Sequence, residues 1–104
     1  MTSIIVRISG RVLLAIVTAY DAGPCCCGPH ARGITRSGRH AEVGITAACG
    51  PDLRGRLIWI EDIGVRWCED AGSGVGLGQV DVLMGSHAEA KRAGRTVREV
   101  VILR

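Results

Sequence analysis

Two aspartates, Asp70 and Asp81, lie eleven residues apart on either side of a glycine-rich segment. The glycines at positions 72, 74, 76 and 78 carry no side chain that would keep a bulky ligand away, and they permit positive backbone angles. Asp81 stands in the apolar run 80–83, which we expect to be a rigid strand at the edge of an open groove. Such a pair of carboxylates can perform acid/base chemistry on a polysaccharide. The same pattern is also typical of a hairpin with solvated carboxylates.

The segments that must position these carboxylates have the composition of strands. β-Branched and aliphatic residues are frequent in them, and glycine, proline and aspartate mark the turns between them. After Asp81 the pattern changes to a short helix over residues 86–93, with Ser86 as N-cap and Gly94 as terminator. We expect strands over residues 2–8, 12–20, 42–48, 57–60, 65–68, 80–83 and 96–103.

The clearest hairpin joins residues 57–60 and 65–68. Gly64 is placed to take a positive φ in the connection. This arrangement predicts that Trp59 and Arg66 are cross-strand partners in a cation–π contact. By strand alternation, Glu69 faces the side opposite to Asp70, and we expect it to be solvated. Asp21 and Asp62 have the sequence context of turn residues.

From Val17 onward, short blocks of residues follow one another in an order that resembles the 3D domain family. These are small double-psi β-barrels named for three aspartates, found in stationary-phase muralytic proteins and in the catalytic domain of membrane-bound lytic transglycosylase A. The resemblance covers residues 12 to 103, and the interval between Asp70 and Asp81 is its most specific part. The blocks are Val17–Tyr20, Cys26–Gly28 with Gly33–Gly38, Ile45–Ala48, Gly55 with Leu57–Ile60, Glu69–Gly72, Val80–Val82, and His87–Ala90 with Gly94.

The chain departs from the family pattern at a signature carboxylate. The first of the three aspartates normally lies twenty-two residues before the second, and that count falls on Ala48. Asp52, four residues later, could replace it if the loop 49–52 bends back. The usual Asp-Gly-Ile-Thr segment begins here with Arg32, and the Asp-Thr-Gly-Gly segment is changed after Asp70.

The resemblance implies a fold and a set of site residues. It implies a mainly β protein, a six-stranded double-psi β-barrel with one short helix near the C-terminus, formed by residues 1–104 as a single domain. Asp81 matches the family's acid/base, and Asp70 would raise its pKa or stabilise a cationic transition state. The pKa of Asp81 could equally be raised by burial. Thr18, Tyr20, Thr35 and Gly72 are the candidate substrate-binding residues, and His87 is expected to cap the helix.

The activity implied by the resemblance is that of a peptidoglycan lytic transglycosylase. Such an enzyme cleaves the β-1,4 bond between N-acetylmuramic acid and N-acetylglucosamine and leaves a 1,6-anhydro end. Two alternatives remain open at this point. One is an inverting glycoside hydrolase on the same barrel, with two carboxylates and a water between them. The other is a non-catalytic, expansin-like module that binds wall polysaccharide.

Composition narrows the possible partners. The chain has 104 residues, a net charge of +3 and a hydrophobic fraction of 47%, which indicates one folded domain. Its arginines are dispersed, so we expect no nucleic-acid partner. The family resemblance implies a peptidoglycan strand as the ligand, and we expect the protein to be a monomer. The apolar run 12–17 is too short for a membrane span and makes a poor signal peptide. A wall-active protein without an export signal suggests an envelope or extracellular site of action. It would be a phage product released at lysis, a component of the virion, or a fragment of a longer precursor.

Five cysteines suggest an oxidising destination. If the barrel resemblance holds, Cys49 and Cys68 end neighbouring strands, and a disulfide between them would tie the site loop to the barrel wall. The triplet Cys25–Cys27, with His30 and His40, could instead be interpreted as metal ligands. Three consecutive cysteines cannot all turn inward on one strand, so we expect no metal and no cofactor, and either a second disulfide or free thiols in that loop.

Overall fold

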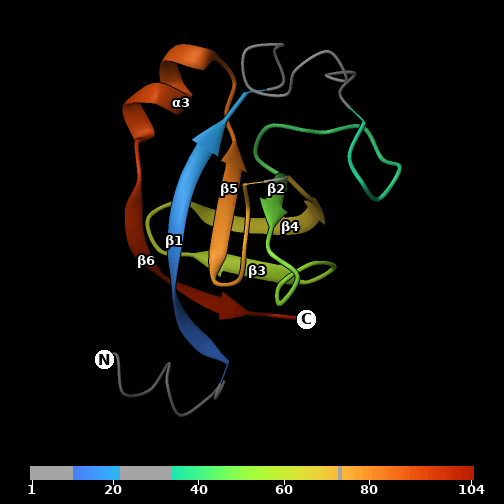
Figure 1. Cartoon of the computed structure of the whole chain (residues 1–104), viewed down its shortest axis with the longest axis vertical. Helices are drawn as coiled ribbons and strands as arrows, with labels where there is room; N and C mark the ends of the chain where they lie inside the picture. Colours follow the sequence, from blue (N-terminus) through green and yellow to red (C-terminus); the bar gives the residue numbers. More distant parts are fainter. Residues whose placement is uncertain (1–10, 22–33, 73) are drawn as a thin grey trace.

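The computed structural model describes residues 11–21, 34–72 and 74–104, and it shows a closed six-stranded β-barrel with one short helix (Figure 1). The predicted strand over residues 2–8 and the cysteine triplet lie outside the described residues. The mainly β fold class and the single C-terminal helix are confirmed. The elements are β1 (Val12–Tyr20), β2 (Thr46–Cys49), β3 (Leu57–Ile60), β4 (Gly64–Asp70), β5 (Gln79–Leu83), α3 (His87–Ala93) and β6 (Thr96–Ile102).

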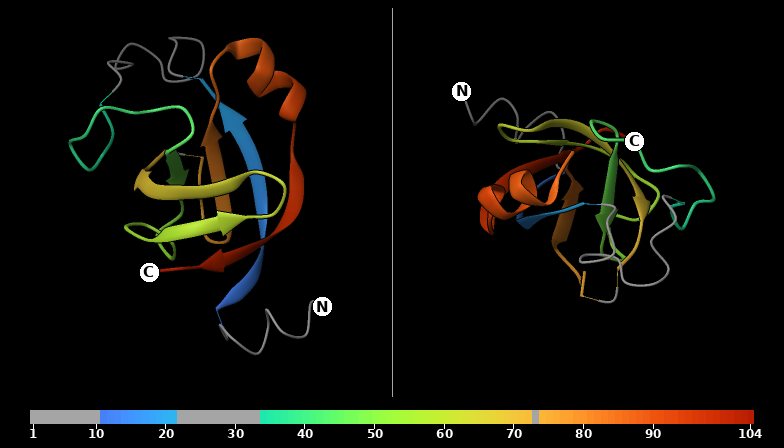
Figure 2. Two further views of the ribbon diagram at one scale, coloured as in Figure 1. Left: turned by 180° about the vertical axis from the view of Figure 1, so that it is seen from behind. Right: turned by 90° about the horizontal axis from the view of Figure 1, so that it is seen from above.

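The strands close in the order β1-β5-β2-β4-β3-β6. Two neighbouring pairs, β1 with β5 and β2 with β4, are parallel, and the other pairs are antiparallel. This mixed, closed topology is compatible with a double-psi barrel. Figure 2 shows the ring of strands from behind and from above, with α3 outside it.

The interior of the barrel is filled by small aliphatic side chains, because the chain contains no phenylalanine. Alternate residues of each strand point inward, as the two-residue period of a strand requires. The buried core consists of Ala15, Val17, Ala47, Cys49, Leu53, Ile58, Ile60, Cys68, Val80, Val82 and Val100.

A disulfide joins Cys49 of β2 to Cys68 of β4, with the two Cα atoms 5.4 Å apart. Both cysteines are fully buried, and their strands are parallel neighbours in the barrel. The pairing implied by the family resemblance is therefore confirmed. The bond links β2 to β4, the strand that ends at Asp70.

Two details of the predicted strands are wrong. The strand predicted from residue 42 begins only at Thr46, because residues 42–45 form a turn in which the Glu42 carbonyl accepts from the Thr46 amide at 2.9 Å and Gly44 takes a φ of 89°. In the β3–β4 hairpin, Ile60 pairs with Gly64, so the connection has three residues and Trp59 lies opposite Val65 instead of Arg66. The positive φ predicted for Gly64 is confirmed at 111°.

The predicted helix is confirmed with its caps. The Ser86 hydroxyl accepts a hydrogen bond from the Glu89 amide at 3.1 Å, and Gly94 ends the helix with a φ of 64°. Such caps satisfy backbone groups that a short helix leaves unpaired. The helix packs against β1, with Ala90 buried, and delivers the chain from β5 to β6.

Candidate functional site

Four of the strands bring the candidate residues into one row across the barrel wall. Thr18 of β1 is the register partner of Asp81 of β5, and Asp81 is in turn the partner of Ala48 of β2. On the other side Ala48 pairs with Asp70 of β4, after a shift in register. Ala48, the position at which the resembled pattern has an aspartate, thus lies between Asp81 and Asp70.

Asp81 points out of the core into a small pocket. Its strand neighbours Val80 and Val82 are fully buried, so alternation turns the Asp81 side chain to the outer face. The glycine-rich segment after β4 reaches over this face and encloses a pocket of about 230 Å³. The predicted residues Thr18, Gly72 and Asp81 therefore meet in one place. The described lining residues are Ile16, Thr18, Gly72, Gly74, Val75, Gln79, Asp81 and Arg95.

The environment of Asp81 favours its protonated form. Burial raises the pKa of the carboxyl group above its ordinary value, because the charged form loses hydration. The Thr18 hydroxyl donates a hydrogen bond to Asp81 Oδ1 at 2.9 Å, which opposes the shift in pKa only in part. Of the two causes considered from the sequence, burial is the one that raises this pKa.

Both carboxylate oxygens of Asp70 accept hydrogen bonds from other residues of the chain. Its Oδ1 accepts from the backbone amides of Arg36 at 3.0 Å and Ala71 at 2.8 Å, and its Oδ2 accepts from the Tyr20 hydroxyl at 3.4 Å. It does not line the Asp81 pocket. The backbones of the two aspartates are two strand spacings, roughly 10 Å, apart. Asp70 thus holds β1, β4 and the loop around Arg36 together beside the pocket.

The predicted binding residues Tyr20 and Thr35 do not line this pocket. The Tyr20 hydroxyl is directed to Asp70, as described above. The Thr35 side chain is buried, and its Oγ1 lies 2.7 Å from Ser37 Oγ in the turn over residues 35–38. Thr35 therefore stabilises the local turn in this structure.

Asp52, considered as a replacement for the missing carboxylate, bonds to the backbone instead. Its two carboxylate oxygens accept from the Gly78 amide at 3.1 and 3.3 Å, which fixes the end of the glycine-rich segment. The same segment passes directly over Gly50, where a Cβ atom would overlap the carbonyl group of Gly76. The loop 50–52 thus supports the glycine-rich segment that covers the pocket, called the pocket cover below. Asp52 does not replace Ala48 in the row between Asp81 and Asp70.

The sequence expectation for the neighbouring carboxylate Glu69 needs correction. Glu69 is not solvated: its side chain is 8% exposed and accepts from Thr46 Oγ1 and Arg39 Nε, each at 2.6 Å. The hydrogen bond from Arg39 lowers the pKa of Glu69, with a smaller effect from Thr46. His87 lies at the start of α3, with its Nδ1 3.4 Å from Asp21 Oδ1.

Sequence reasoning missed Gln79 and Arg95 as pocket residues. The Gln79 side chain accepts from the Gly76 amide at 2.7 Å and so fixes the pocket cover. Arg95 follows Gly94 and precedes β6, and it reaches the site only because barrel closure places β6 beside β1. A polar residue next to Asp81 on the same strand face, as Gln79 is, was the available sequence signal.

The described residues contain no cluster of three or more histidine, cysteine, aspartate or glutamate side chains able to hold a metal ion. The triplet Cys25–Cys27 is not among these residues. Within the same ranges, no helix has the length and apolar character needed to cross a membrane. No family model matches the chain, and a comparison with curated proteins finds no match either.

Proposed function

We propose that this protein is a peptidoglycan lytic transglycosylase of the 3D type, acting at the cell envelope, with Asp81 as its acid/base. The observation that carries the proposal is that Asp81 is the one carboxylate among the described residues of the pocket, and that burial raises its pKa. A lytic transglycosylase needs a single carboxyl group that starts the reaction protonated.

The two proton transfers fall to the same group. Protonated Asp81 donates to the glycosidic oxygen as the bond from muramoyl C1 to that oxygen breaks, and positive charge develops at C1. The resulting carboxylate takes the proton of the muramoyl 6-hydroxyl, whose oxygen closes the 1,6-anhydro ring on C1. Asp81 ends the cycle protonated, and no water is consumed. The Thr18 hydroxyl orients the carboxyl group through its 2.9 Å hydrogen bond.

An inverting hydrolase receives less support from this site. That mechanism needs a second carboxylate to activate a water molecule on the opposite side of the scissile bond. Asp70 is the nearest candidate by register, but its oxygens already accept from two backbone amides and from Tyr20. In the proposed mechanism Asp70 is therefore a positioning residue that holds the loop beside the pocket.

Ala48 favours a second function, that of a non-catalytic module that binds wall polysaccharide. It provides only a methyl group at the row position between Asp81 and Asp70. If the family's first aspartate is essential for turnover, the pocket would bind glycan without cleaving it. The two proposals share a ligand and differ only in whether a bond breaks.

Digestion of purified sacculi separates the proposals. Wild-type protein is expected to release soluble muropeptides that carry 1,6-anhydro ends, identified by mass spectrometry, and Asp81→Asn is expected to release none. Products with reducing ends would instead show a hydrolase. Binding to sacculi without any soluble product, by wild type and variant alike, would overturn the enzyme proposal and support the binding module.

A further inference from the structure

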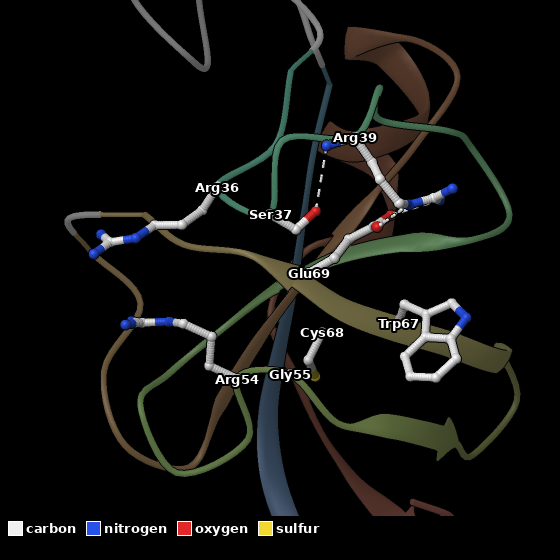
Figure 3. Close-up of a pocket in the computed structure, with 8 residues that line it drawn as sticks. All are labelled: Arg36, Ser37, Arg39, Arg54, Gly55, Trp67, Cys68 and Glu69. Carbon is white, nitrogen blue, oxygen red and sulfur yellow. Dashed lines mark hydrogen bonds and ion pairs between the residues drawn. The ribbon is translucent and has the colours of Figure 1, made fainter.

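A second and larger pocket lies at the end of β4, with a volume of about 480 Å³ (Figure 3). It is separate from the Asp81 pocket, and the described lining residues of the two have no member in common. Its lining combines three arginines, one carboxylate and an indole ring. The residues are Arg36, Ser37, Arg39, Arg54, Gly55, Trp67, Cys68 and Glu69.

The walls of this pocket are held by backbone hydrogen bonds. On one side the Ser37 amide donates to the Glu69 carbonyl at 3.1 Å, and on the other the Gly55 amide donates to the Cys68 carbonyl at 2.7 Å. Two loops are thereby attached to the last residues of β4. The Cys49–Cys68 disulfide fixes the same strand from the core side. The pocket is thus built by several independent links and does not depend on one flexible side chain.

The charges in the pocket do not cancel. Arg39 forms an ion pair with Glu69 through Nε and Oε1 at 2.6 Å, so these two side chains neutralise each other. Within the described part of the chain, no carboxylate lies in ion-pair contact with the guanidinium group of Arg36 or of Arg54. Figure 3 shows these two side chains extending in the same direction, at the end of the pocket away from Trp67.

The position of the pocket relates it to the Asp81 site. Trp67 and Glu69 flank the inward-facing Cys68, so their side chains lie on the outer face of the barrel, as does that of Asp81. The Arg36 amide also donates to Asp70, the carboxylate that follows Ala48 in the row. A ligand that spans several sugar units could therefore contact both pockets.

We propose that this pocket is an anion subsite, in which Arg36 and Arg54 bind a carboxylate of the stem peptide carried by the glycan and Trp67 packs against the adjoining peptide or sugar. Guanidinium groups bind carboxylates through paired, charge-assisted hydrogen bonds. Each muramoyl residue can carry a peptide with free carboxylates, whereas the sugar rings are uncharged. The choice of a peptide ligand rests on the proposed function, while the affinity for a carboxylate does not.

Binding is measured without turnover in an Asp81→Asn background, with Trp59→Phe added so that Trp67 is the sole tryptophan and can be excited selectively over Tyr20. The probes are a soluble disaccharide-peptide with free carboxylates, the same compound with its carboxylates amidated, and a peptide-free N-acetylglucosamine tetramer. The free-carboxylate probe is expected to quench or shift Trp67 fluorescence with an affinity that weakens as salt is added. The other two probes are expected to bind about fivefold to tenfold more weakly, as loss of one or two exposed charge-assisted contacts predicts.

The decisive variant is Arg36→Gln/Arg54→Gln, and the matched control is Lys91→Gln/Arg92→Gln, which removes two positive charges from the exposed surface of α3. The pocket variant is expected to lose the same fivefold to tenfold in affinity for the free-carboxylate probe, and the control is expected to retain it. Arg36→Lys/Arg54→Lys keeps the charge and is expected to recover part of the loss. Thermal unfolding of each variant verifies that the barrel is intact.

The proposal is overturned if the pocket variant binds as tightly as the control, or if the amidated and free probes bind equally. It is also overturned if poly(glycerol phosphate) binds this pocket more tightly than the disaccharide-peptide, which would identify a phosphodiester polymer as the ligand. Failure of wild-type protein to digest sacculi would remove the enzyme proposal only. Carboxylate binding at Trp67 would then still be observed if the subsite is correct.

Discussion

Asp81 owes its proposed role to a balance between burial and one hydrogen bond. The pocket cover removes water from the carboxyl group and raises its pKa, while the Thr18 hydroxyl stabilises the anion. The pocket cover directly precedes Asp81 in the sequence, whereas Thr18 lies 63 positions away and reaches it only through barrel closure. The sequence predicted the residue and offered two causes for a raised pKa, burial and the charge of Asp70, and the choice between them required the structure.

Replacing Asp81 by asparagine is expected to abolish release of 1,6-anhydromuropeptides and to leave thermal stability unchanged or slightly raised at neutral pH. The amide keeps the shape of the side chain but cannot exchange the proton, and it removes a partly buried charge. Because the folded-state pKa of Asp81 is raised, the contribution of this group to stability is greatest at low pH, below its unfolded pKa, and is lost as the pH rises through the folded pKa. The stability difference between variant and wild type should therefore shift in favour of the variant as the pH increases, measured by chemical unfolding between pH 3 and 8.

Replacing Asp70 by alanine is expected to destabilise the fold by about 1–3 kcal/mol, because the amides of Arg36 and Ala71 lose their acceptor. Asp70→Asn keeps one acceptor oxygen and should lie between alanine and wild type. Both variants are expected to retain measurable cleavage, at a reduced rate, since the proton carrier remains. Complete loss of cleavage in a folded Asp70→Asn protein would instead show that Asp70 takes part in the chemistry.

At the scale of elements, the site depends on how loops are attached to strand ends. Glu69 joins Arg39 of the loop before β2 to Thr46 of β2 itself. Its lowered pKa means that the stability it provides is fully present above its unfolded pKa, near 4.5, and is lost as the pH falls through the lower folded pKa. At pH 7, Glu69→Gln is expected to unfold at a lower urea midpoint than wild type. The difference between the two midpoints is expected to become smaller at low pH, as measured by urea titration. A difference that stays constant from pH 7 to pH 2 would contradict this assignment.

The pocket cover depends on the absence of a side chain at Gly50. A methyl group there would overlap the Gly76 carbonyl, and backbone cannot yield as a flexible side chain does. We expect Gly50→Ala to cost about 1–3 kcal/mol, as overpacking does, and to displace the cover from Asp81. Gly74→Ala is the control, because its Cβ would meet open space and its φ is not positive. Equal unfolding midpoints for the two variants would argue against the close approach.

At the scale of the whole molecule, local patterns predicted most elements. They did not predict which residues of different elements lie side by side. Strand alternation and helix caps are short-range signals. The predicted bounds of the strands over residues 12–20 and 57–60 and of the helix therefore agree closely with the structure. The row that joins Asp81, Ala48 and Asp70 is set by barrel closure and by a register shift in β2. Arg95 enters the pocket for the same long-range reason, and no local pattern marks it.

The buried disulfide is expected to hold this small barrel together. A cross-link that closes a loop with a sequence separation of 19 restricts the unfolded chain and contributes roughly 3 kcal/mol. Cys49→Ala/Cys68→Ala, or reduction of wild type, is therefore expected to lower the melting temperature by about 12–20 °C in a domain of this size. Reductant should have no further effect on the double variant.

A matched variant separates this bond from the cysteine triplet. Cys25→Ser/Cys26→Ser/Cys27→Ser keeps only Cys49 and Cys68, so its melting temperature should still fall in reductant, and its native state should show no free thiol. The fall arises because an opened bond no longer restricts the unfolded chain, and opening also removes the covalent link between β2 and β4 near the strand end that carries Asp70. Cleavage of sacculi should consequently decline at temperatures below the melting transition, as the row that includes Asp81 loses one of its supports. A triple variant that melts at the same temperature with and without reductant would show that the bond contributes nothing to stability.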